Sequence, residues 1–465
     1  MLLVTDVVII GGGPGGYEAA LVGAQLGGNV TLVERRGLGG SAVLTDVVPS
    51  KTLIATAEVM TSIRGAGNLG IHASGVTVDL GRVNERVLEL ALRQSADITS
   101  RLRGEGIRIL DGTGRLDGTE AVVASTPDGE ERLPADIILV ATGARPRELP
   151  EARPDGERIL NWTQMYSLRT LPERLIVVGS GVTGAEFASA YHALGVDVVL
   201  VSSRHQVLPG EDADAGRVLQ QVFESSGMTI LSRARAQAAR RTGDGVVVTL
   251  SDGRTVEGSH VLVAVGAVPN TEELGLAEAG IALAPSGHIT VDKVSRTSAR
   301  GVYAAGDCTG VFALASVAAM QGRIAMWHAL GDAVSPLDLR TVSANVFTAP
   351  EIATVGVGQA EVDARLVAAR AVMLPLGSNA RAKMQGLSDG FVKVFCLPTT
   401  GIIIGGVVVA PNAGELIHVL ALAVASKITV DELAQAFTVY PSLSGSIAEA
   451  GRRLHGRDGE TQTSI

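Results

Sequence analysis

The stretch Gly11-Gly12-Gly13-Pro14-Gly15-Gly16 (GGGPGG) decides the fold because of the segments that flank it. The short apolar run before it, Val7–Ile10, predicts a buried strand, and the alanine-rich segment after it, Tyr17–Leu26, predicts a helix. A second apolar run, Val30–Val33, predicts the next strand and ends at the acidic residue Glu34. Glycines spaced G-x-G-x-x-G between a strand and a helix, with an acidic residue ending the next strand, indicate a dinucleotide-binding unit.

Four residues of this unit have distinct predicted roles. Gly11 permits the tight turn, Gly13 lets the backbone approach a pyrophosphate, and Gly16 allows the helix to pack closely. The pyrophosphate would lie at the helix N-terminus, where free N–H groups and the helix dipole favour negative charge. Glu34 would accept hydrogen bonds from the ribose hydroxyls of an adenosine. A plain glycine turn, the alternative explanation, does not account for both strands and the carboxylate.

The same design recurs further along the chain. The apolar run Leu175–Val178 predicts a strand, and Gly179-Ser180-Gly181-Val182-Thr183-Gly184 follows it. A helix is predicted from Ala185 and a second strand over Val196–Val201. A second dinucleotide site is therefore expected, with the glycines of its loop in the same roles.

The two units differ at the end of the second strand. Glu34 lies 23 residues after Gly11, and the same offset from Gly179 falls on Ser202. No carboxylate would therefore repel a 2′-phosphate at the second site, and an arginine can bind phosphate bidentately. These features favour NADPH, with NADH tolerated, although Arg204 as an ordinary surface charge remains an alternative. The polar residues offered there are Ser202, Ser203, Arg204 and His205.

Composition agrees with a large α/β protein. The chain has 465 residues, of which 46% are hydrophobic, 19% charged and only 3% aromatic. This length suggests roughly two to four domains, and the composition fits strands buried on both faces between alanine-rich helices. A net charge of −9 without a basic tract argues against nucleic acid as a partner. The longest apolar runs, such as Ile402–Ala410, are too short to span a bilayer.

Cysteine and histidine usage excludes several kinds of site. The chain has only two cysteines, Cys308 and Cys396, which form neither a CxxC motif nor a disulfide scaffold. Its eight histidines are dispersed without metal-ligand spacing, so no metal site is expected. Reduced thiols, together with a start that lacks a basic segment, favour a cytoplasmic protein without a signal peptide.

Each dinucleotide unit also ends in a similar way. Ile138–Pro146 (ILVATGARP) and Leu262–Pro269 (LVAVGAVP) each combine an apolar run with a glycine turn and a proline. We interpret both as crossing points at which the chain leaves one unit for the next. Two dinucleotide sites in one chain imply electron transfer between two cofactors.

At this point the chain resembles the flavoprotein disulfide reductase family, which includes dihydrolipoamide dehydrogenase and glutathione reductase. The resemblance covers nearly the whole length of the chain. Within that family, the chain resembles a branch of cysteine-less NAD(P)H:quinone reductases. It rests on GGGPGG at Gly11, PSK at Pro49, ATGARP at Ala141, GSGVTGAE at Gly179, YAAGDC at Tyr303, VFTAPEIATVG at Val346 and PSLS at Pro441.

The resemblance implies an α/β fold with two Rossmann-like dinucleotide-binding domains and a C-terminal α+β dimerisation domain. An FAD-binding domain would cover 1–149 and 273–338, interrupted by an NAD(P)H-binding domain at 150–272. Residues 339–465 would form the interface domain of a homodimer. Within that domain we expect a central strand around Gly405–Val409 and a helix over Ala413–Ala425.

FAD would occupy the first site and NAD(P)H the second. Asp307, after a strand predicted over Gly301–Ala304, would bind the ribityl chain, Gly114 would approach the adenine, and Ala315 would lie near the flavin ring. The residues implied for FAD are Gly11, Gly13, Gly16, Glu34, Gly40, Ser41, Lys51, Gly114, Thr142, Gly143, Asp307 and Ala315. Those implied for NAD(P)H are Gly179, Gly181, Val182, Thr183, Gly184, Ser202, Ser203, Arg204 and Gly266.

The departures from the family are as informative as the matches. The family carries a redox pair, C-x-x-x-x-C, where this chain has Ala42 and Val47. The histidine of the family's C-terminal base is replaced by Tyr440, and its orienting glutamate by Gly445. Thiol–disulfide exchange needs a thiolate and a base, so the loss of all four indicates that this chemistry was abandoned. The sequence therefore excludes dihydrolipoamide dehydrogenase activity.

The part of the mechanism that handles hydride is retained. In the family, residues matching Lys51 and Glu186 form an ion pair beside flavin N5, where a cation stabilises the charge of the reduced ring. The alternatives are a surface lysine and a solvated acid in the first turn of a helix. Val182 stands where the family can place a gating aromatic, so access for nicotinamide is less restricted.

We therefore expect an FAD-dependent oxidoreductase that passes hydride from NADPH, or NADH, to flavin N5 and then to a quinone or similar small acceptor. Ala42 and Val47 would offer the quinone an apolar surface. Tyr440 of the second subunit would donate a hydrogen bond to it or simply pack at the dimer interface. Two alternatives are a soluble pyridine nucleotide transhydrogenase and, in another class, a flavin-bound scaffold or interaction protein.

Overall fold

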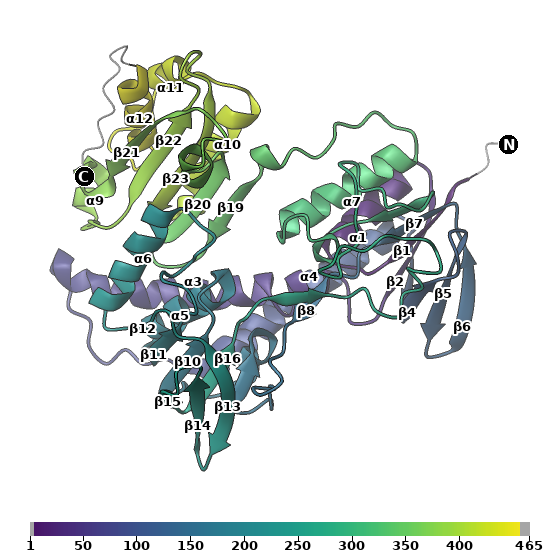
Figure 1. The fold of residues 1–465 in the computed structure, drawn as a ribbon, viewed down its shortest axis with the longest axis horizontal. Helices are drawn as coiled ribbons and strands as arrows, with labels where there is room; N and C mark the ends of the chain where they lie inside the picture. Colours follow the sequence, from purple (N-terminus) through teal and green to yellow (C-terminus); the bar gives the residue numbers. More distant parts are fainter. Residues whose placement is uncertain (1–3, 456–465) are drawn as a thin grey trace.

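A computed structural model describes residues 4–455, so the outer ends of the predicted first and last domains lie outside the described residues. Three parts are visible in Figure 1, each built on a five-stranded sheet. The first sheet is parallel throughout, with strand order β18-β7-β1-β2-β3. Its strands are β1 (Asp6–Ile10), β2 (Asn29–Glu34), β3 (Arg108–Asp111), β7 (Ile137–Val140) and β18 (Val302–Ala304).

The glycine motif lies where the sequence predicts it, between β1 and the helix α1 (Pro14–Gln25). The helix begins at Pro14 rather than at the predicted Tyr17. Proline suits the first position of a helix because its missing N–H would have no intrahelical partner there. The two following glycines are accommodated because they pack closely against the rest of the unit. Because the first turn of this helix is rich in glycine, the sequence pattern does not predict it.

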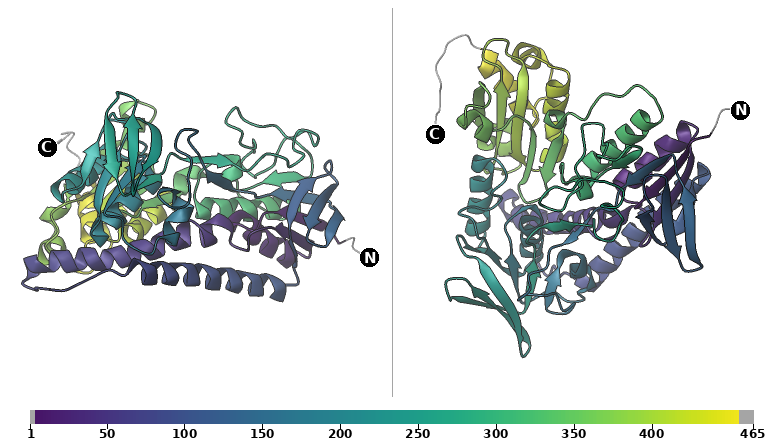
Figure 2. Two further views of the ribbon diagram at one scale, coloured as in Figure 1. Left: turned by 90° about the horizontal axis from the view of Figure 1, so that it is seen from below. Right: turned by 45° about the vertical axis from the view of Figure 1, so that its right-hand side comes forward.

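Helices cover the first sheet and connect it to its neighbours. Helix α1 packs against α7 (Ala315–Ala329), and β2 is followed by the short helix α2 (Gly40–Leu44). Two long helices, α3 (Val47–Gly65) and α4 (Leu80–Gly104), pack against each other along one side of the molecule (Figure 2). A three-stranded antiparallel sheet packs against strands of the first sheet and is made of β4 (Thr113–Leu116), β5 (Ala121–Thr126) and β6 (Gly129–Pro134).

The second sheet repeats the design of the first. Its parallel strands follow the order β12-β11-β10-β16-β9, and helix α5 (Val182–Leu194) follows the central strand β10 (Arg174–Val178). Helix α5 begins at Val182 rather than at the predicted Ala185, for the same glycine-related reason as α1. The other elements are β9 (Ile159–Asn161), β11 (Asp197–Val201), β12 (Thr229–Leu231), β16 (His260–Val263), α6 (Ala213–Ser225) and the antiparallel strands β13 (Ala236–Thr242), β14 (Gly245–Leu250) and β15 (Thr255–Gly258).

The two predicted crossing points lie side by side. Strand β8 (Ala144–Pro146) leads into the second unit, and β17 (Ala267–Pro269) leads out of it. The two pair antiparallel, with Arg145 opposite Val268. Strand β8 lies between the two units in Figure 1.

The C-terminal part is built on an antiparallel sheet with strand order β19-β20-β23-β22-β21. The predicted central strand is correct, because β23 (Ile403–Ala410) occupies the middle position. The predicted helix is α10 (Ala413–Ala425), and it packs on β20 and β23. The remaining elements are β19 (Ser343–Val346), β20 (Glu351–Gly356), β21 (Arg370–Pro375), β22 (Phe391–Cys396), α8 (Gln359–Asp363), α9 (Ala380–Met384), α11 (Val430–Gln435) and α12 (Gly445–His455).

A buried lysine fastens the C-terminal sheet to the second unit. Lys393 of β22 is 2% exposed, and its Nζ lies 2.8 Å from Asp212 Oδ2 and 2.6 Å from Asp214 Oδ2. Asp212 also caps helix α6 by accepting from the backbone N–H groups of Asp214 and Ala215. A buried cation is tolerated here because two carboxylates share it.

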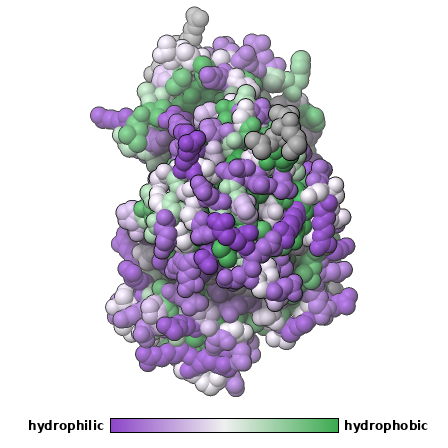
Figure 3. Space-filling model, turned by 90° about the vertical axis from the view of Figure 1, so that its right-hand side faces the viewer, coloured by the Kyte–Doolittle hydropathy of each residue, from purple (hydrophilic) through white to green (hydrophobic). Residues whose placement is uncertain are grey.

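The surface of the protein exposes mainly polar side chains. Figure 3 shows polar side chains spread over one face, with hydrophobic ones gathered mainly toward the end where the C-terminal sheet lies in Figure 1. No helix within residues 4–455 is long and apolar enough to cross a membrane. The predicted fold class is confirmed, whereas the domain boundaries stay predictions.

Candidate active site

A cavity of about 550 Å³ opens at the carboxyl ends of β1, β2, β7 and β18. Ligands of open α/β sheets bind at this edge, and the volume lies within the range of ligand sites. Most of the residues predicted to bind FAD line this one cavity: Gly11, Gly13, Glu34, Gly40, Ser41, Gly114, Thr142, Gly143, Asp307 and Ala315. Gly16 and Lys51, the other two residues of that set, do not line it.

The glycine loop is shaped to receive a phosphate group. Gly11 has φ +103°, and a Cβ added to Gly16 would lie 1.8 Å from the Gly11 carbonyl oxygen, so both positions require glycine. A Cβ on Gly13 would meet no atom within 4 Å, because that side of the loop faces the cavity. No side chain caps α1, whose first N–H groups remain available to an anion. The cradle therefore fits the pyrophosphate of FAD.

Glu34 lies at the end of β2 and lines this cavity. Its Oε2 accepts a hydrogen bond of 2.7 Å from the Gly12 N–H, and its Oε1 accepts one of 2.7 Å from the Arg36 N–H. The carboxylate is thereby fixed at the end of β2 and still reaches the cavity. This is the position from which it would bind ribose hydroxyls, as the sequence predicts.

Other predicted FAD contacts lie around the same cavity. Asp307 follows β18, and burial raises the pKa of its carboxyl while His288 opposes that rise. Thr142 donates its hydroxyl to the Asn270 carbonyl at 2.6 Å, so it offers a ligand mainly its backbone. Gly143 has φ +68°, a conformation that keeps the adjoining turn free of side chains.

The second glycine loop reproduces the first almost atom for atom. Gly179 has φ +112°, and a Cβ added to Gly184 would lie 1.9 Å from the Gly179 carbonyl oxygen. A Cβ on Gly181 would meet nothing within 4 Å. Val182 begins α5 and is 40% exposed, and Thr183 follows it in the first turn. Helix α5, like α1, has no side-chain cap, so its N-terminus can also receive a pyrophosphate.

The end of β11 differs from the prediction in one respect. Ser202 is fully buried, and its hydroxyl lies 2.6 Å from the Ser180 hydroxyl and accepts from the Arg204 N–H at 3.1 Å. Ser202 therefore shapes the turn and does not present its side chain to a ligand in this geometry. Ser203 and Arg204 are exposed, which fits both contact with a cofactor and an ordinary surface position.

A second arginine, which the sequence interpretation missed, adjoins Arg204. Arg233 donates its backbone N–H to the Arg204 carbonyl at 2.8 Å, with φ at +54°. Both residues are exposed, and neither guanidinium forms an ion pair within residues 4–455. Arg233 lies 29 residues beyond Arg204, outside the glycine-to-strand pattern, so the motif gives no signal for it.

Lys51 and Glu186 form the ion pair that the resemblance implies. Lys51 Nζ of α3 donates to Glu186 Oε2 of α5 at 2.7 Å, and Glu186 is 3% exposed. Phe347 completes this cluster from beyond β19, because its N–H donates to Glu186 Oε1 at 2.9 Å and its ring lies 4.9 Å from Lys51 Nζ. Three parts of the molecule therefore hold one ammonium group in place. Phe347 was missed, although it lies in the quoted VFTAPE segment.

Carbon, not sulfur, forms the cavity wall beside this cluster. Ala42 and Val47 both line the cavity, at the positions where the family carries its redox pair. The two cysteines are free and buried, and neither lines the cavity. Burial raises the pKa of the Cys308 thiol to about 11, which disfavours a reactive thiolate. Within the described residues, no thiol is placed to relay electrons.

Tyr440 does not line the cavity of its own chain. It lies between α11 and α12, is 84% exposed, and is followed by Pro441 through a cis peptide bond. Gly445, in the predicted position of the lost glutamate, is the first residue of α12. The exposure of Tyr440 is compatible with its predicted position at a second subunit.

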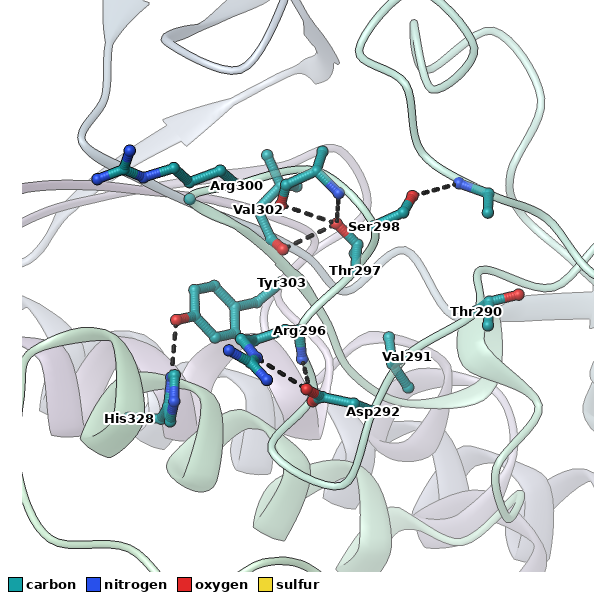
Figure 4. Close-up of a pocket in the computed structure, with 13 residues that line it drawn as sticks. Thr290, Val291, Asp292, Arg296, Thr297, Ser298, Arg300, Val302, Tyr303 and His328 are labelled. Carbon is teal, nitrogen blue, oxygen red and sulfur yellow. Dashed lines mark hydrogen bonds and ion pairs between the residues drawn. The ribbon is translucent and has the colours of Figure 1, made fainter.

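A second cavity, of about 610 Å³, lies at the opposite end of β18 (Figure 4). Several of its polar side chains are already paired within the protein. Arg296 Nε lies 2.7 Å from Asp292 Oδ2, and the Tyr303 hydroxyl lies 2.9 Å from His328 Nδ1. These groups stabilise the wall of the cavity, which contains none of the predicted site residues.

Comparison with known proteins agrees with this geometry. The family model described as pyridine nucleotide-disulphide oxidoreductase matches residues 5–322, and the model of its dimerisation domain matches residues 342–451. The chain is 56% identical over 468 residues to a protein named NAD(P)H dehydrogenase (quinone) from Mycobacterium tuberculosis, covering 98% of this chain and 95% of that protein.

Two further relatives extend the comparison. A dihydrolipoyl dehydrogenase from Zymomonas mobilis is 34% identical over 463 residues, which cover 97% of this chain and 99% of that protein. The crystal structure of LpdA from Mycobacterium tuberculosis has a TM-score of 0.93 at 56% identity, covering 97% of this chain and 100% of that one.

Proposed function

Because this chain belongs to the pyridine nucleotide-disulphide oxidoreductase family, we propose that it is an FAD-dependent NAD(P)H:quinone oxidoreductase that works without a redox disulfide. The observation that carries the proposal is the combination of an intact Lys51–Glu186 pair with carbon at positions 42 and 47. The name of the 56% identical Mycobacterium tuberculosis protein, NAD(P)H dehydrogenase (quinone), supports the same acceptor class.

Bound FAD would supply the two-electron relay between reduced nicotinamide and the acceptor. The chain itself supplies position and charge. The ammonium of Lys51 would stabilise negative charge that develops next to it, and Glu186 and Phe347 keep that ammonium from turning away. A fixed cation needs no reorganisation when charge develops, which is the main advantage of such an arrangement.

Ala42 and Val47 would provide an apolar surface for a flat quinone ring. Arg204 and its neighbour Arg233 would bind the 2′-phosphate of NADPH, which we propose as the preferred donor over NADH. Because both guanidinium groups are free of ion pairs within residues 4–455, a phosphate would not have to displace a carboxylate from them.

We further propose that the protein acts as a homodimer. The dimerisation domain is present, and Phe437, Val439 and Tyr440 expose hydrophobic surface between α11 and α12. Exposed apolar side chains that adjoin one another mark interaction surfaces. Light scattering of the purified protein at working concentration should give twice the 47.8 kDa chain mass. The cytoplasmic location expected from the sequence stays a prediction.

The central test is an anaerobic titration of the FAD-loaded protein with NADPH. Loss of the oxidised flavin absorbance should be followed by its return on addition of menadione, and not on addition of lipoamide. Return with thio-NAD alone would instead identify a transhydrogenase. Absence of bleaching by either nucleotide would identify a flavin-bound scaffold.

A variant links the test to the proposed site. Lys51→Met should slow bleaching by NADPH about 10²- to 10³-fold, the loss typical of removing one preorganised electrostatic group. Lys293→Met, which removes an exposed lysine outside the cavity, should leave the rate unchanged and serves as control. Equal rates in the two variants would contradict the role given to Lys51.

A further inference from the structure

We infer that Asp46 is a catalytic acid, which delivers to the quinone the one proton that hydride transfer does not supply. This inference rests on the proposed quinone reductase function and deepens it. Nothing in the dinucleotide motifs or in the Lys51–Glu186 pair provides such a proton, because Lys51 is engaged as a fixed cation.

The first argument is the position of Asp46. It lies in the loop that joins α2 to α3, one residue before Val47, and it lines the same cavity as Ala42 and Val47. The carboxyl is therefore placed on the wall where the acceptor is proposed to bind. It is the one acidic residue between positions 41 and 51.

The second argument is that this carboxyl accepts no hydrogen bond that would stabilise the fold. Asp46 is the residue before the first turn of α3, a position where an aspartate commonly accepts a hydrogen bond from the helix backbone. It forms no such bond, and proline at position 49 has no N–H to offer at the third helical residue. No side chain or backbone group within residues 4–455 donates a hydrogen bond to the carboxyl. Both oxygens remain available to a ligand.

The third argument is the set of groups that face Asp46. They are Lys51 of the same helix, Glu186 of α5, Asp307 after β18 and Tyr166 between β9 and β10. Burial raises the pKa of Asp46 to about 6, with Lys51 opposing the rise and Glu186 and Asp307 adding to it. The pKa of Tyr166 is raised well above its usual value by burial, so its phenol stays neutral. With its pKa raised to about 6, Asp46 can exchange a proton near neutral pH.

The proton balance of quinone reduction requires such a group. Conversion of a quinone to a hydroquinone takes up two electrons and two protons, while NADPH, oxidised to NADP⁺, supplies two electrons and one proton as hydride. The second proton would leave the Asp46 carboxyl as its O–H bond breaks and a new O–H bond forms on the quinone oxygen. Water would return a proton to the carboxylate after the product leaves.

The test compares acceptors that do and do not take a proton. With FAD-loaded Asp46→Asn, kcat/KM for menadione should fall about 10²-fold near pH 6, within the usual range for removal of a general acid. Ferricyanide reduction and bleaching by NADPH should change less than about twofold, because neither step would use this proton. Glu58→Gln, which removes a carboxylate from the same helix outside the cavity, should match the native protein throughout.

The pH profile supplies a sharper criterion. Native kcat/KM for menadione should decline as the pH rises above about 6, whereas Asp46→Asn should lose that decline. Asp46→Glu should restore part of both rate and profile. An unchanged menadione profile in Asp46→Asn would overturn the inference, provided the native protein reduces menadione. Native protein that is bleached by NADPH but reduces no quinone would overturn the proposed function instead.

A readout without turnover tests the same group. The folded protein holds the Asp46 proton more tightly than the unfolded chain, so stability from this residue is present at low pH and is lost as the pH rises from about 4 to about 6. Asp46→Asn should therefore have a higher Tm than the native holoprotein above about pH 7, and the difference should shrink toward about pH 4. A Tm difference that does not vary with pH would contradict a buried, titrating carboxyl. Asp46→Ala should behave as Asp46→Asn and replaces it if that variant does not fold.

Discussion

The two dinucleotide-binding units share one backbone design and differ in the residue that ends the second strand. Their glycine loops agree within about ten degrees in φ, +103° at Gly11 and +112° at Gly179, and both helices begin without a side-chain cap. The first unit then places Glu34 against the loop N–H of Gly12, whereas the second places Ser202 against the Ser180 hydroxyl. The glycine turn is thus the same in both units, while the residue at the end of the second strand differs and would select the ribose under the proposed function.

The difference also explains how the units divide the work. Glu34 is a fixed acceptor on the wall of the cavity in which we propose that FAD stays bound. Ser202 is buried, whereas Ser203 and Arg204 are exposed and would be open to the nucleotide that we propose binds and leaves there. The Lys51–Glu186 pair joins the two units at the place where electrons would pass.

Alanine at the third glycine of each loop should have the largest effect. Gly16→Ala and Gly184→Ala would each place a Cβ within 2 Å of a carbonyl oxygen. The backbone would have to move to relieve this overlap. Each change should lower the free energy of unfolding of its unit by about 3 kcal/mol. Gly16→Ala protein should be colourless when purified, while Gly184→Ala should keep its flavin and lose bleaching by NADPH.

Alanine at the middle glycines is the matched control for that pair. A Cβ at Gly13 or Gly181 would meet no protein atom within 4 Å, so the fold should be unchanged. Only approach of the pyrophosphate should suffer, seen as a weaker Kd for the respective nucleotide. If Gly184→Ala released flavin as readily as Gly16→Ala, the two units would not be independent.

Arg204→Ala should have the next largest effect and should act on one nucleotide. Loss of a charge-assisted hydrogen bond to a phosphate costs about 1.5–3 kcal/mol, so kcat/KM for NADPH should fall about 10- to 100-fold. The value for NADH should change less than about twofold, because NADH has no 2′-phosphate. Arg254→Ala, which removes an exposed guanidinium paired with Asp252 in a hairpin, is the control. An equal loss for both nucleotides would indicate a structural role for Arg204.

Glu34→Gln should affect only the first unit. The amide keeps one acceptor oxygen but cannot accept from both the Gly12 and Arg36 N–H groups, and it carries no charge. Because one charge-assisted hydrogen bond is weakened, FAD should dissociate about 10-fold faster when the protein is diluted. Bleaching by NADPH in the protein that retains flavin should be unaffected. A change in the KM for NADPH would contradict the separation of the units.

Ser202→Ala should have the smallest effect. It leaves the Ser180 hydroxyl and the Arg204 N–H without their partner, which predicts a loss of about 1 kcal/mol in stability of the unit. The KM for NADPH should rise only a few-fold, through a looser turn at Arg204. A loss as large as that of Arg204→Ala would show that the serine contacts the nucleotide directly.

Periodicity and motif spacing were sufficient to predict the parts of the molecule that local sequence determines. Apolar runs followed by a glycine motif predicted β1 and β10 within one residue, because a buried parallel strand is apolar throughout. The starts of α1 and α5 were placed three residues late, since glycine and proline are poor helix formers in general but fit these first turns.

The candidate site was predictable where one motif supplies one contact. Glu34, Lys51 and Glu186 lie where their motifs place them, whereas Phe347 and Arg233 reach the site through tertiary contacts that no spacing encodes. Ser202 was assigned to the ligand, but its burial depends on a neighbouring hydroxyl from another strand end. Asp46 gives no motif signal, because its importance follows from what surrounds it in space.

The antiparallel pairing of β8 with β17 has a consequence for how this architecture can be rebuilt. Because Pro146 lies directly opposite Ala267, roughly 5 Å separates the points where the chain departs and returns. A two-residue turn would bridge that gap, so everything between could be cut out as a cassette or exchanged for one of another specificity. The removal would also sever the Lys393 pairs with Asp212 and Asp214, the support that Glu186 gives to Lys51 and Phe347, and the apolar core that this unit shares with α3 and the C-terminal sheet, so an exchanged segment would have to restore these contacts.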